Sequence, residues 1–487
     1  MSKDRPEALP NESEAGEHAG PSVNDERSYN RIVWDLAWPA VALNSLQTVN
    51  SLLDAKFLGV LGRDSLSASG GALNVMFFFM SLAFALGTGA TALVSRFYGA
   101  GESFNLIKAC RQATSLGIVL GLVFASLGAL LVPFAARLFV GDNDIVYREL
   151  IRYLYPAMVG VPAFYTFITL AASLRAVGDT LRPMYVSGFQ ILVHIVLNFL
   201  LMFPSRDVTL HLDVFGWQLF DTVVHVPGAG WGIAGAGWAF AISAWVAVLI
   251  YFPVASQTVL GPVWRLQMLS LRWAWRIFRI AAPAALGALI RVTSFMAFTA
   301  ALKYTAEGTD ALGALRVGFS MESLAFMPAF GYYIAASALV GQSLGMNDPD
   351  RAERLAWSAT HQAVGIMTVM SVIFLIFAPQ LAGFFVDDPV QLKSAIIFLR
   401  IMALTEPLFG YGMVLMGAHQ GAGDTVRPMI VSFVTMWLIR APGTWVFAVW
   451  LHGDSTAAWW VMGITQGING LIMIWLFKQG KWKEKRV

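Results

Sequence analysis

The chain of 487 residues is 57% hydrophobic and only 13% charged, and its mean hydropathy is +0.62. Soluble globular chains carry about twice this share of charge, so the composition excludes an ordinary water-facing surface and indicates one that contacts lipid. The net charge is +3 with no basic run before the last residues, which argues against nucleic acid as a partner. The single cysteine, Cys110, excludes an internal disulfide and a cysteine-based metal cluster.

Residues 1–30 are polar and of mixed charge, and we expect them to form a disordered tail. They do not have the pattern of a signal peptide, because no short apolar stretch follows a basic start. The first apolar segment is long enough to be a membrane span itself.

Twelve apolar stretches follow, each long enough to cross a hydrocarbon core of about 30 Å as a helix. Their continuous rather than alternating hydrophobicity favours helices over barrel strands, so we predict an all-α membrane protein. The expected spans are 32–53, 71–95, 113–133, 154–174, 184–203, 231–254, 280–302, 318–341, 360–382, 396–418, 428–451 and 457–477. Between the fifth and sixth spans, residues 204–230 form the longest outer loop, with the pattern of a short hairpin.

The distribution of basic residues predicts the orientation of these spans. If the N-terminus is cytoplasmic, Lys and Arg are about twice as frequent in the inside segments as in the outside ones. The connection 265–279 and the C-terminal tail carry the clearest bias. We therefore expect a multi-pass protein of the cell membrane with both termini in the cytoplasm.

The two halves of the chain repeat each other. Gly178–Met184 reads GDTLRPM and Gly423–Met429 reads GDTVRPM, which is six identities in seven residues. Pro162 matches Pro407 at the same offset. Each half holds six spans, so both halves enter the membrane from the same side, and such parallel repeats are related by a pseudo-two-fold axis along the membrane normal.

The repeat divides the chain into two six-helix lobes between two tails. We expect the disordered tail at 1–30, an N-terminal lobe at 31–262, a C-terminal lobe at 263–478 and a basic cytoplasmic tail at 479–487. Two similar bundles that enclose a central cavity can rock against each other, which favours alternating access over a channel.

These motifs resemble those of the multidrug and toxic compound extrusion (MATE) family over roughly residues 30–478. The resemblance is carried by the first span, with Asp54 in its outer half, by the motif Ser95–Gly101 and by the two glycine-aspartate turns just described. It implies a V-shaped, twelve-helix exporter that exchanges organic, multidrug-type cations for protons or sodium ions. It also implies that Asp54, at the position of the family's first-helix acid, is the ion-coupling group.

The physical argument for Asp54 is independent of that resemblance. An ionisable group inside a span is costly and is a functional candidate by default. Gln47 lies two turns earlier on the same face, and we expect it to assist Asp54 by hydrogen bonding nearby. The alternative is a solvated residue at the membrane rim, paired with Lys56.

The fifth span offers His194 and Asn198, one turn apart on one face. Relatives with an acid on this helix have Asn followed four residues later by Asp, so the second carboxylate is missing here. His194 would titrate near neutral pH and could compensate, or it could simply be a buried packing residue. The missing carboxylate slightly favours H⁺ over Na⁺ as the coupling ion, because a sodium site needs several oxygen ligands.

The second half is not a chemical copy of the first, since Arg291 stands where Gln47 stands in the first half. Arg291 could pair with Glu322 or with Glu406, both of which lie in apolar surroundings. Either glutamate could instead bind a cationic substrate or a proton, and an unpaired Arg291 could select anions. We treat these three residues as a substrate-binding or secondary charge site.

Pro39 is the residue that we predict to be a hinge, because it interrupts the first helix upstream of Gln47 and Asp54. No nucleotide-binding loop, catalytic cluster or metal site is recognisable, so we expect neither an enzyme nor a cofactor. The favoured function is a secondary antiporter, which we expect to act as a monomer in the lipid bilayer. The alternative is a flippase of lipids or lipid-linked oligosaccharides from the same wider superfamily.

Overall fold

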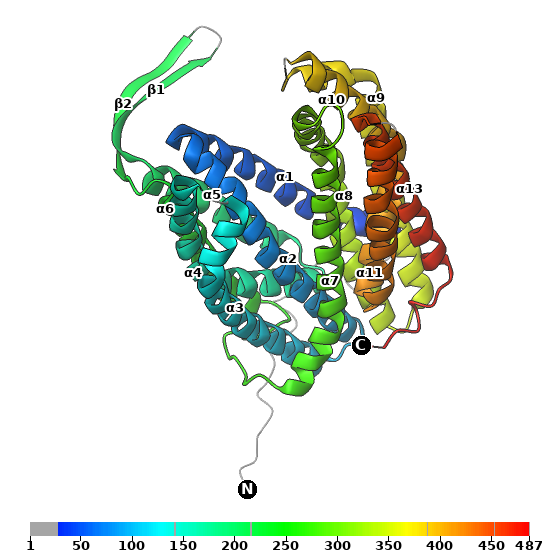
Figure 1. Ribbon diagram of the computed structural model, residues 1–487. Coiled ribbons are helices and arrows are strands. Elements are labelled where there is room, and N and C mark those ends of the chain that lie inside the picture. Colours follow the sequence, from blue (N-terminus) through cyan, green and yellow to red (C-terminus); the bar gives the residue numbers. More distant parts are fainter. Residues whose placement is uncertain (1–27, 141–142, 215–216, 387, 452, 487) are drawn as a thin grey trace.

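The computed structural model describes residues 28–140, 143–214, 217–386, 388–451 and 453–486, and they form twelve long helical segments and one hairpin (Figure 1). The first six helices are α1 (Tyr29–Leu61), α2 (Arg63–Gly99), α3 (Ser103–Val140), α4 (Asp144–Ala176), α5 (Leu181–Met202) and α6 (Ile233–Ser256). The next five are α7 (Leu271–Leu302), α8 (Thr309–Gly345), α9 (Pro349–Gly383), α10 (Pro389–Gly421) and, last in the chain, α13 (Ser455–Lys478). The segment before α13 consists of α11 (Val426–Ser432), η1 (Phe433–Arg440), α12 (Ala441–Gly443) and η2 (Thr444–Leu451), where η marks a π-helix. Most of the expected tail at 1–30 lies outside the described residues.

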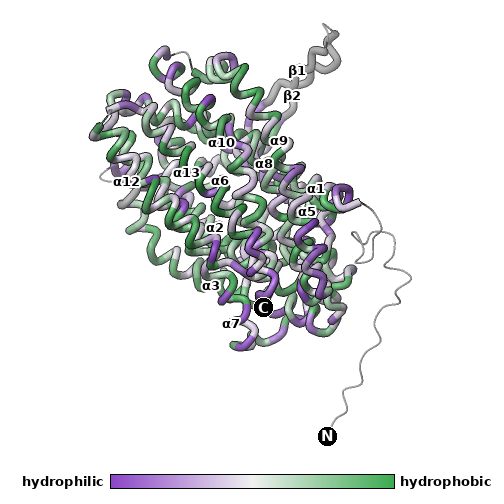
Figure 2. Tube along the Cα trace, turned by 90° about the vertical axis from the view of Figure 1, so that its right-hand side faces the viewer, coloured by the Kyte–Doolittle hydropathy of each residue, from purple (hydrophilic) through white to green (hydrophobic). Residues whose placement is uncertain are grey.

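The prediction of an all-α membrane protein with twelve spans is confirmed. Ten of the twelve segments are long and apolar enough to cross a membrane by composition. The other two are α1 and α10, which carry Asp54 and Glu406 respectively. Large apolar side chains such as Leu130 and Phe134 on α3 are exposed, as expected of helices that face lipid. Figure 2 shows hydrophobic residues along the helices and hydrophilic ones gathered near the end that carries both termini.

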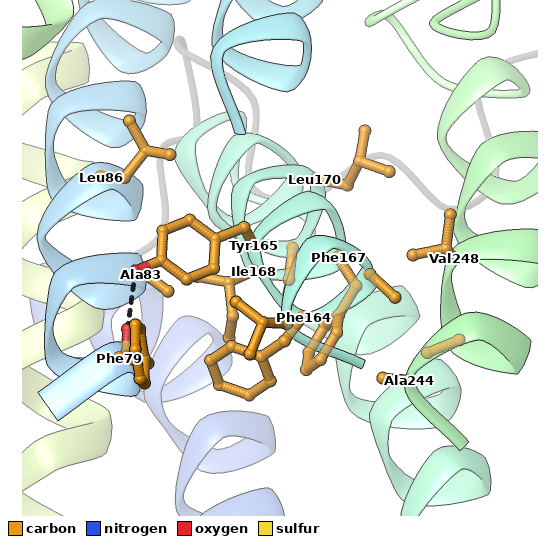
Figure 3. Packing of buried hydrophobic residues seen from close by; sticks show 14 of the residues in the cluster. Phe79, Ala83, Leu86, Phe164, Tyr165, Phe167, Ile168, Leu170, Ala244 and Val248 are labelled. Atoms are coloured by element: carbon orange, nitrogen blue, oxygen red, sulfur yellow. Dashed lines mark hydrogen bonds between the residues drawn. The ribbon is translucent and has the colours of Figure 1, made fainter. Parts of the chain in front are cut away.

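Two lobes account for the buried side chains. The first hydrophobic core is built mainly from α2, α3, α4 and α6. Figure 3 shows its centre, where Phe164, Phe167 and Ile168 of α4 pack between α2 and α6, and where the Tyr165 hydroxyl donates to the carbonyl oxygen of Phe79 at 2.9 Å. The second lobe buries two clusters, formed by α8, α9, α10 and α13 together with parts of their neighbours.

Helices α1 and α7 contribute to both lobes. The first turns of α1, including Ile32 and Leu36, belong to a core cluster of the second lobe, whereas Leu58 belongs to the core of the first. Likewise, Ile277 of α7 packs in the first lobe and Phe298 in the second. α1 and α7 are the first helices of the two sequence repeats, and each of them packs against both lobes.

The lobes approach most closely near the termini, at the ends of α2 and α8. A Cβ atom on Gly99 would lie 1.9 Å from the Gln342 carbonyl oxygen, and one on Gly345 would lie 2.2 Å from the Arg96 carbonyl oxygen. Only glycine permits backbones to come this close. In Figure 1 the lobes diverge from this end toward the hairpin end.

The hairpin expected between the fifth and sixth spans is present. Strands β1 (Pro204–Val214) and β2 (Trp217–Ala229) pair antiparallel, with Asp207 opposite His225. The hairpin projects from the end of the molecule opposite the C-terminus (Figure 1). It follows directly on α5, so that the functional candidates on α5 lie near the hairpin end.

Candidate functional site

The structure brings Asp54 of α1 together with His194 and Asn198 of α5. Asn198 Nδ2 donates to Asp54 Oδ1 at 2.7 Å, and His194 Nε2 lies 3.3 Å from Asp54 Oδ2. His194 and Asn198 are one helical turn apart, and their side chains are also in contact, at 3.1 Å. The three residues that the sequence indicated on two separate helices thus form one polar cluster.

Asn50 completes this cluster and was missed by the sequence analysis. It lies one turn before Asp54 on α1, and its Nδ2 donates to Asp54 Oδ2 at 3.3 Å. Its four-residue spacing was a visible signal. Gln47 was expected to assist Asp54, but it is exposed and has no described hydrogen bond from its side chain to that carboxylate. Seven residues along a helix correspond to about 10 Å, which is too far for such a contact.

Several polar atoms of the cluster have no hydrogen-bond partner among the described residues. They are the side-chain oxygens of Asn50 and Asn198 and the Nδ1 atom of His194. Asn198 and His194 are buried, whereas the Asp54 side chain is 29% exposed. A buried polar atom without a partner is costly, so the site has capacity for a further ligand next to a reachable carboxylate.

The contact between Asp54 and His194 depends on the position of a proton. If Asp54 is ionised, His194 Nε2 must carry hydrogen, because an unprotonated ring nitrogen would face the carboxylate with its lone pair. If Asp54 is protonated instead, His194 Nε2 can accept its hydrogen. The pair can therefore hold a proton on either side of a single contact.

Among the described residues, Arg291 makes no ion pair with Glu322 or Glu406. Arg291 Nη1 is 3.9 Å from the Met416 sulfur, and its charge interacts with Tyr333. The structure thus does not support the expected pairing of Arg291 with Glu322 or Glu406. Arg440 of η1 interacts with Glu322 instead. Arg440 also lies within an expected span, at 428–451, but its interaction with Glu322 is a tertiary property that no local pattern reveals.

Tyr333 belongs to a contact between the lobes. Its hydroxyl group donates to the side-chain oxygen of Gln420 on α10, and Thr88 of α2 hydrogen-bonds to the same oxygen at 3.4 Å. Arg291 thus interacts with Tyr333, Tyr333 with Gln420, and Gln420 with Thr88 of the first lobe.

Pro39 is buried within α1, at a point where that helix passes close to α8. A Cβ atom on Gly331 of α8 would lie 2.6 Å from the side chain of Val41 and 3.0 Å from the carbonyl oxygen of Ala37. Pro39 lacks the N–H group of a helical hydrogen bond, so α1 is weakened at this contact, which lies between its part in the second lobe and its part in the first. Its role as a hinge stays a prediction.

The described residues contain no group of three or more His, Cys, Asp or Glu side chains that could hold a metal ion. The chemistry available at the α1–α5 cluster is therefore that of one carboxylate, one imidazole and neutral amide oxygens. Such a set can bind a proton or a monovalent cation and can attract a cationic organic molecule.

Comparisons with known proteins agree with this architecture. A family model described as MatE matches residues 39–200 and 283–446. "Probable multidrug resistance protein NorM" of Thermotoga maritima is 24% identical over 455 residues, covering 93% of each chain. "Probable multidrug resistance protein YoeA" of Bacillus subtilis is 22% identical, covering 92% of this chain and 93% of that one.

Solved structures share the fold. A transporter of the MOP superfamily from Pyrococcus furiosus superposes with a TM-score of 0.83 at 19% identity, covering 94% of this chain and 98% of that one. A structure described as the outward-facing conformation of a multidrug resistance MATE family transporter gives a TM-score of 0.82 with the same identity and coverage.

Proposed function

Because the chain belongs to the MatE family of membrane transporters, we propose that it is a secondary antiporter that exports organic cations in exchange for protons. Members of this family are multi-pass transport proteins rather than enzymes, and relatives of this chain are named multidrug resistance proteins. What we propose beyond family membership is the exchange for ions and the identity of the substrate.

The contact between Asp54 and His194 is the observation that supports coupling to protons. A proton on this pair neutralises Asp54, whereas its release leaves a carboxylate that attracts an organic cation. Because one site then binds either the proton or the substrate, each promotes release of the other. The partial exposure of the Asp54 side chain leaves it reachable for both.

Helices α1 and α7, which pack in both lobes, support the mechanical part of the proposal. Rocking of the two lobes would expose the site on alternate sides, with Pro39 as the hinge in α1 and the close approach of α2 and α8 as the seal. We place both termini in the cytoplasm, which puts the seal on that side, and we propose that one chain suffices for transport. Arg291, beside Tyr333, is proposed as a charge that orients the substrate.

Sodium is the competing coupling ion. The unpaired oxygens of Asn50 and Asn198 lie beside the Asp54 carboxylate and could be ligands of Na⁺. They supply fewer oxygens than hard cations commonly take, unless water completes the shell. The histidine, which has no role in binding Na⁺ at this position, favours the proton.

Transport should be measured in proteoliposomes loaded with ethidium, under an imposed proton gradient or sodium gradient. We expect efflux driven by the proton gradient, lost in Asp54→Asn and reduced in His194→Gln with an altered pH profile. Asp64→Asn is a matched control, since Asp64 is an exposed acid at the start of α2. His361→Gln is the control for the histidine, since His361 stacks on Trp357 in the other lobe.

Each alternative gives a different result. Efflux driven only by the sodium gradient, with His194→Gln unaffected, would contradict proton coupling at this pair. Efflux that persists in Asp54→Asn would remove Asp54 from the mechanism. No movement of ethidium under either gradient would reject the organic-cation substrate, and a lipid-flipping assay would then test the flippase alternative.

A further inference from the structure

Basic and apolar side chains gather where the connection between α6 and α7 meets the first lobe. Residues 257–279 comprise this connection and the first turns of α7, and they contain four arginines and no acidic residue. In Figure 1 the connection lies at the end of the molecule that carries the C-terminus. The transport mechanism proposed above does not use these charges.

Helix α3 adds two cations to the same surface. The Lys108 Nζ atom lies 5.9 Å from the centroid of the Trp273 ring, and the Arg276 guanidinium group lies 4.9 Å from the same centroid. Arg111 follows Lys108 by about one turn of α3 and interacts with Arg265 of the connection as a like charge. The basic patch thus consists of Lys108, Arg111, Arg265, Arg272, Arg276 and Arg279.

The positive charge of the basic patch has little compensation among the described residues. Arg272, one turn before Arg276 on α7, interacts with it as a like charge, and Glu102 is the acid that interacts with Arg276. Lys108, Arg111 and Arg272 form no salt bridge with any described residue. The buried Nε atom of Arg111 has no hydrogen-bond partner there either. Such a concentration of one charge favours an anionic ligand.

Exposed apolar side chains accompany these cations. Met268 is 95% exposed and Leu271 is 85% exposed, and the side chains of Trp264 and Trp275 are exposed as well. All four lie between the sixth and seventh expected spans, where they would contact water unless lipid covered them. Tryptophan next to arginine is typical of segments at the membrane–water interface. These residues therefore indicate that the basic patch lies at the depth of the lipid headgroups.

Hydrogen bonds fix the connection against α3. Gln112 Nε2 donates to the Met268 carbonyl oxygen at 3.0 Å, and Gln112 Oε1 accepts from the Ser270 N–H group at 2.9 Å. Ser115 Oγ donates to the Gln267 carbonyl oxygen at 3.0 Å. A connection fixed in this way presents its side chains on a preformed surface, so a ligand does not have to order it on binding.

The orientation of the chain in the membrane does not by itself account for this arrangement. The bias that sets orientation depends on the number of basic residues in a loop and does not require them to converge from separate helices. Here Lys108 of α3 and Arg276 of α7 meet at one buried indole ring, that of Trp273. An acidic protein surface would match the charges but would not explain the exposed Met268 and Leu271 side chains.

We propose that the basic patch binds the headgroup of one anionic phospholipid. Lys108, Arg111 and Arg272 supply positive charge to its phosphate, and the exposed apolar side chains of the connection contact its acyl chains. Basic pockets between membrane helices are known to bind such headgroups. A lipid bound there would join α3 to the start of α7, the helix that packs in both lobes. This site is independent of which ion or substrate the chain transports.

Native mass spectrometry of the purified full-length chain in detergent can measure this binding. Phosphatidylglycerol is the anionic probe, and phosphatidylcholine with the same acyl chains is the lipid without net charge. The double variant Lys108→Gln/Arg111→Gln removes two charges on α3. The double variant Arg272→Gln/Arg279→Gln removes two exposed charges on α7.

The wild-type chain should bind one phosphatidylglycerol molecule at least tenfold more tightly than phosphatidylcholine. Each double variant of the basic patch should lose at least tenfold in affinity for phosphatidylglycerol, because each basic residue near an anionic lipid strengthens binding. Lys478→Gln/Lys481→Gln is the matched control, since it removes the same charge from two exposed side chains of the C-terminal segment, and it should bind like the wild type. Thermal unfolding without added lipid shows whether each variant is folded, and the α7 variant alters only exposed side chains.

Three results would overturn the proposal. They are wild-type affinity in a folded variant of the basic patch, equal binding of the two lipids, and an equal loss in the control variant. Inorganic phosphate at the concentration of the lipid should not displace phosphatidylglycerol, and displacement would assign the patch to a free phosphate ion instead. Because the experiment involves no ethidium efflux, its outcome is separate from that of the proposed antiport.

Discussion

Asp54 and Asn198 make the shortest contact of the α1–α5 site, at 2.7 Å. Asn198→Asp would place a second carboxyl group at this distance, and two carboxylates so close cannot both be ionised. We expect the variant to retain proton-driven efflux with its pH optimum moved by about one unit or more toward alkaline pH. The pH profile of ethidium efflux measures this shift.

Asn74→Asp is the control for this experiment, because Asn74 is an exposed asparagine on α2 that bonds only within its own helix. Its profile should match that of the wild type. An unchanged profile in Asn198→Asp would show that the carboxyl group of residue 198 does not share a proton with Asp54.

Arg440 is a buried positive charge that interacts with Glu322 in the second lobe. Arg440→Met would leave two carboxyl groups without a compensating charge, and breaking a buried pair in this way costs about 3–5 kcal/mol. We expect a loss of this size in the free energy of unfolding in detergent, with partial recovery when Glu322→Gln is added.

The matched control is Arg316→Met, since Arg316 is an exposed arginine on α8. Its substitution should change stability by less than about 1 kcal/mol. A cost for Arg440→Met no larger than that of the control would contradict the assignment of Arg440 as the compensating charge.

Sequence reasoning identified Asp54, His194 and Asn198 because intramembrane polar residues are rare enough to be conspicuous. It could not join them, since contact between α1 and α5 is a tertiary property. For the same reason it offered Arg291 rather than Arg440 as the partner of the glutamates. Both arginines lie in spans, and only the folded structure shows that Arg440 interacts with Glu322 and Arg291 with Tyr333.

At the scale of helices, the contact between α2 and α8 depends on glycine. The atom that a Cβ on Gly99 would meet is the backbone carbonyl oxygen of Gln342, which cannot move aside as a flexible side chain would. Gly99→Ala should therefore separate the two helix ends, at a cost of about 1–3 kcal/mol. Spin labels on α2 and α8 should report a longer distance and a larger open population at this end.

Gly365→Ala provides the comparison, because a Cβ atom at this position of α9 meets nothing within 4 Å. This change should stabilise the helix by about 0.5–1 kcal/mol and leave the distance unchanged. Equal distances in the two variants would rule out glycine as the determinant of the seal.

The turn between α10 and α11 adds an electrostatic contribution outside the spans. Burial opposes ionisation of Asp424, but the hydrogen bond from His419 and the positive charges of His419, Arg427 and Lys485 outweigh it and hold the pKa of Asp424 below its ordinary value. A carboxyl group with a lowered pKa in the folded state stabilises above its unfolded pKa and loses this contribution as pH falls.

We expect Asp424→Asn to be less stable than the wild type by about 1–3 kcal/mol at neutral pH. The difference should shrink as pH falls below about 4, where the carboxylate of the unfolded chain is protonated. Unfolding measured against pH tests this, with Asp350→Asn, an exposed acid at the start of α9, as the control. A difference that is independent of pH would exclude the charge as its origin.

For the molecule as a whole, the repeated GDTxRPM turn and the even number of spans predicted two equivalent lobes, and the structure has them. The assignment of whole helices to one lobe was beyond the sequence, because α1 and α7 each bury one end in either lobe. The packing of the basic tail expected at 479–487 was also beyond the sequence, since Trp482 is fully buried and stacks on Phe477, with ring centroids 4.6 Å apart.

That tail connects the lobes at their closed end. Arg96 of α2 donates to the carbonyl oxygens of Leu344, Ala422 and Lys485, the last at 2.9 Å. Gln342 of α8 donates in the opposite direction, to the carbonyl oxygen of Ala176 at 2.8 Å. The repeat aligns Arg96 with Gln342, so each lobe provides one long side chain that reaches the other.

Deletion of residues 481–487 should therefore weaken closure at this end, because it removes one acceptor of Arg96 and the buried indole ring of Trp482. A hydrogen bond to a charged group contributes about 1.5–3 kcal/mol, which corresponds to about a tenfold or larger rise in the open population. A cysteine at Ser95, which is fully buried, can report this through its rate of labelling by an impermeant maleimide in a Cys110→Ser background. Lys483→Gln is the control, since it breaks the partly exposed pairs with Asp350 and Glu353 but leaves Trp482 and the Lys485 carbonyl oxygen in place, and it should have little effect. A deletion variant that is labelled no faster than Lys483→Gln would show that Arg96 holds the lobes together without the tail.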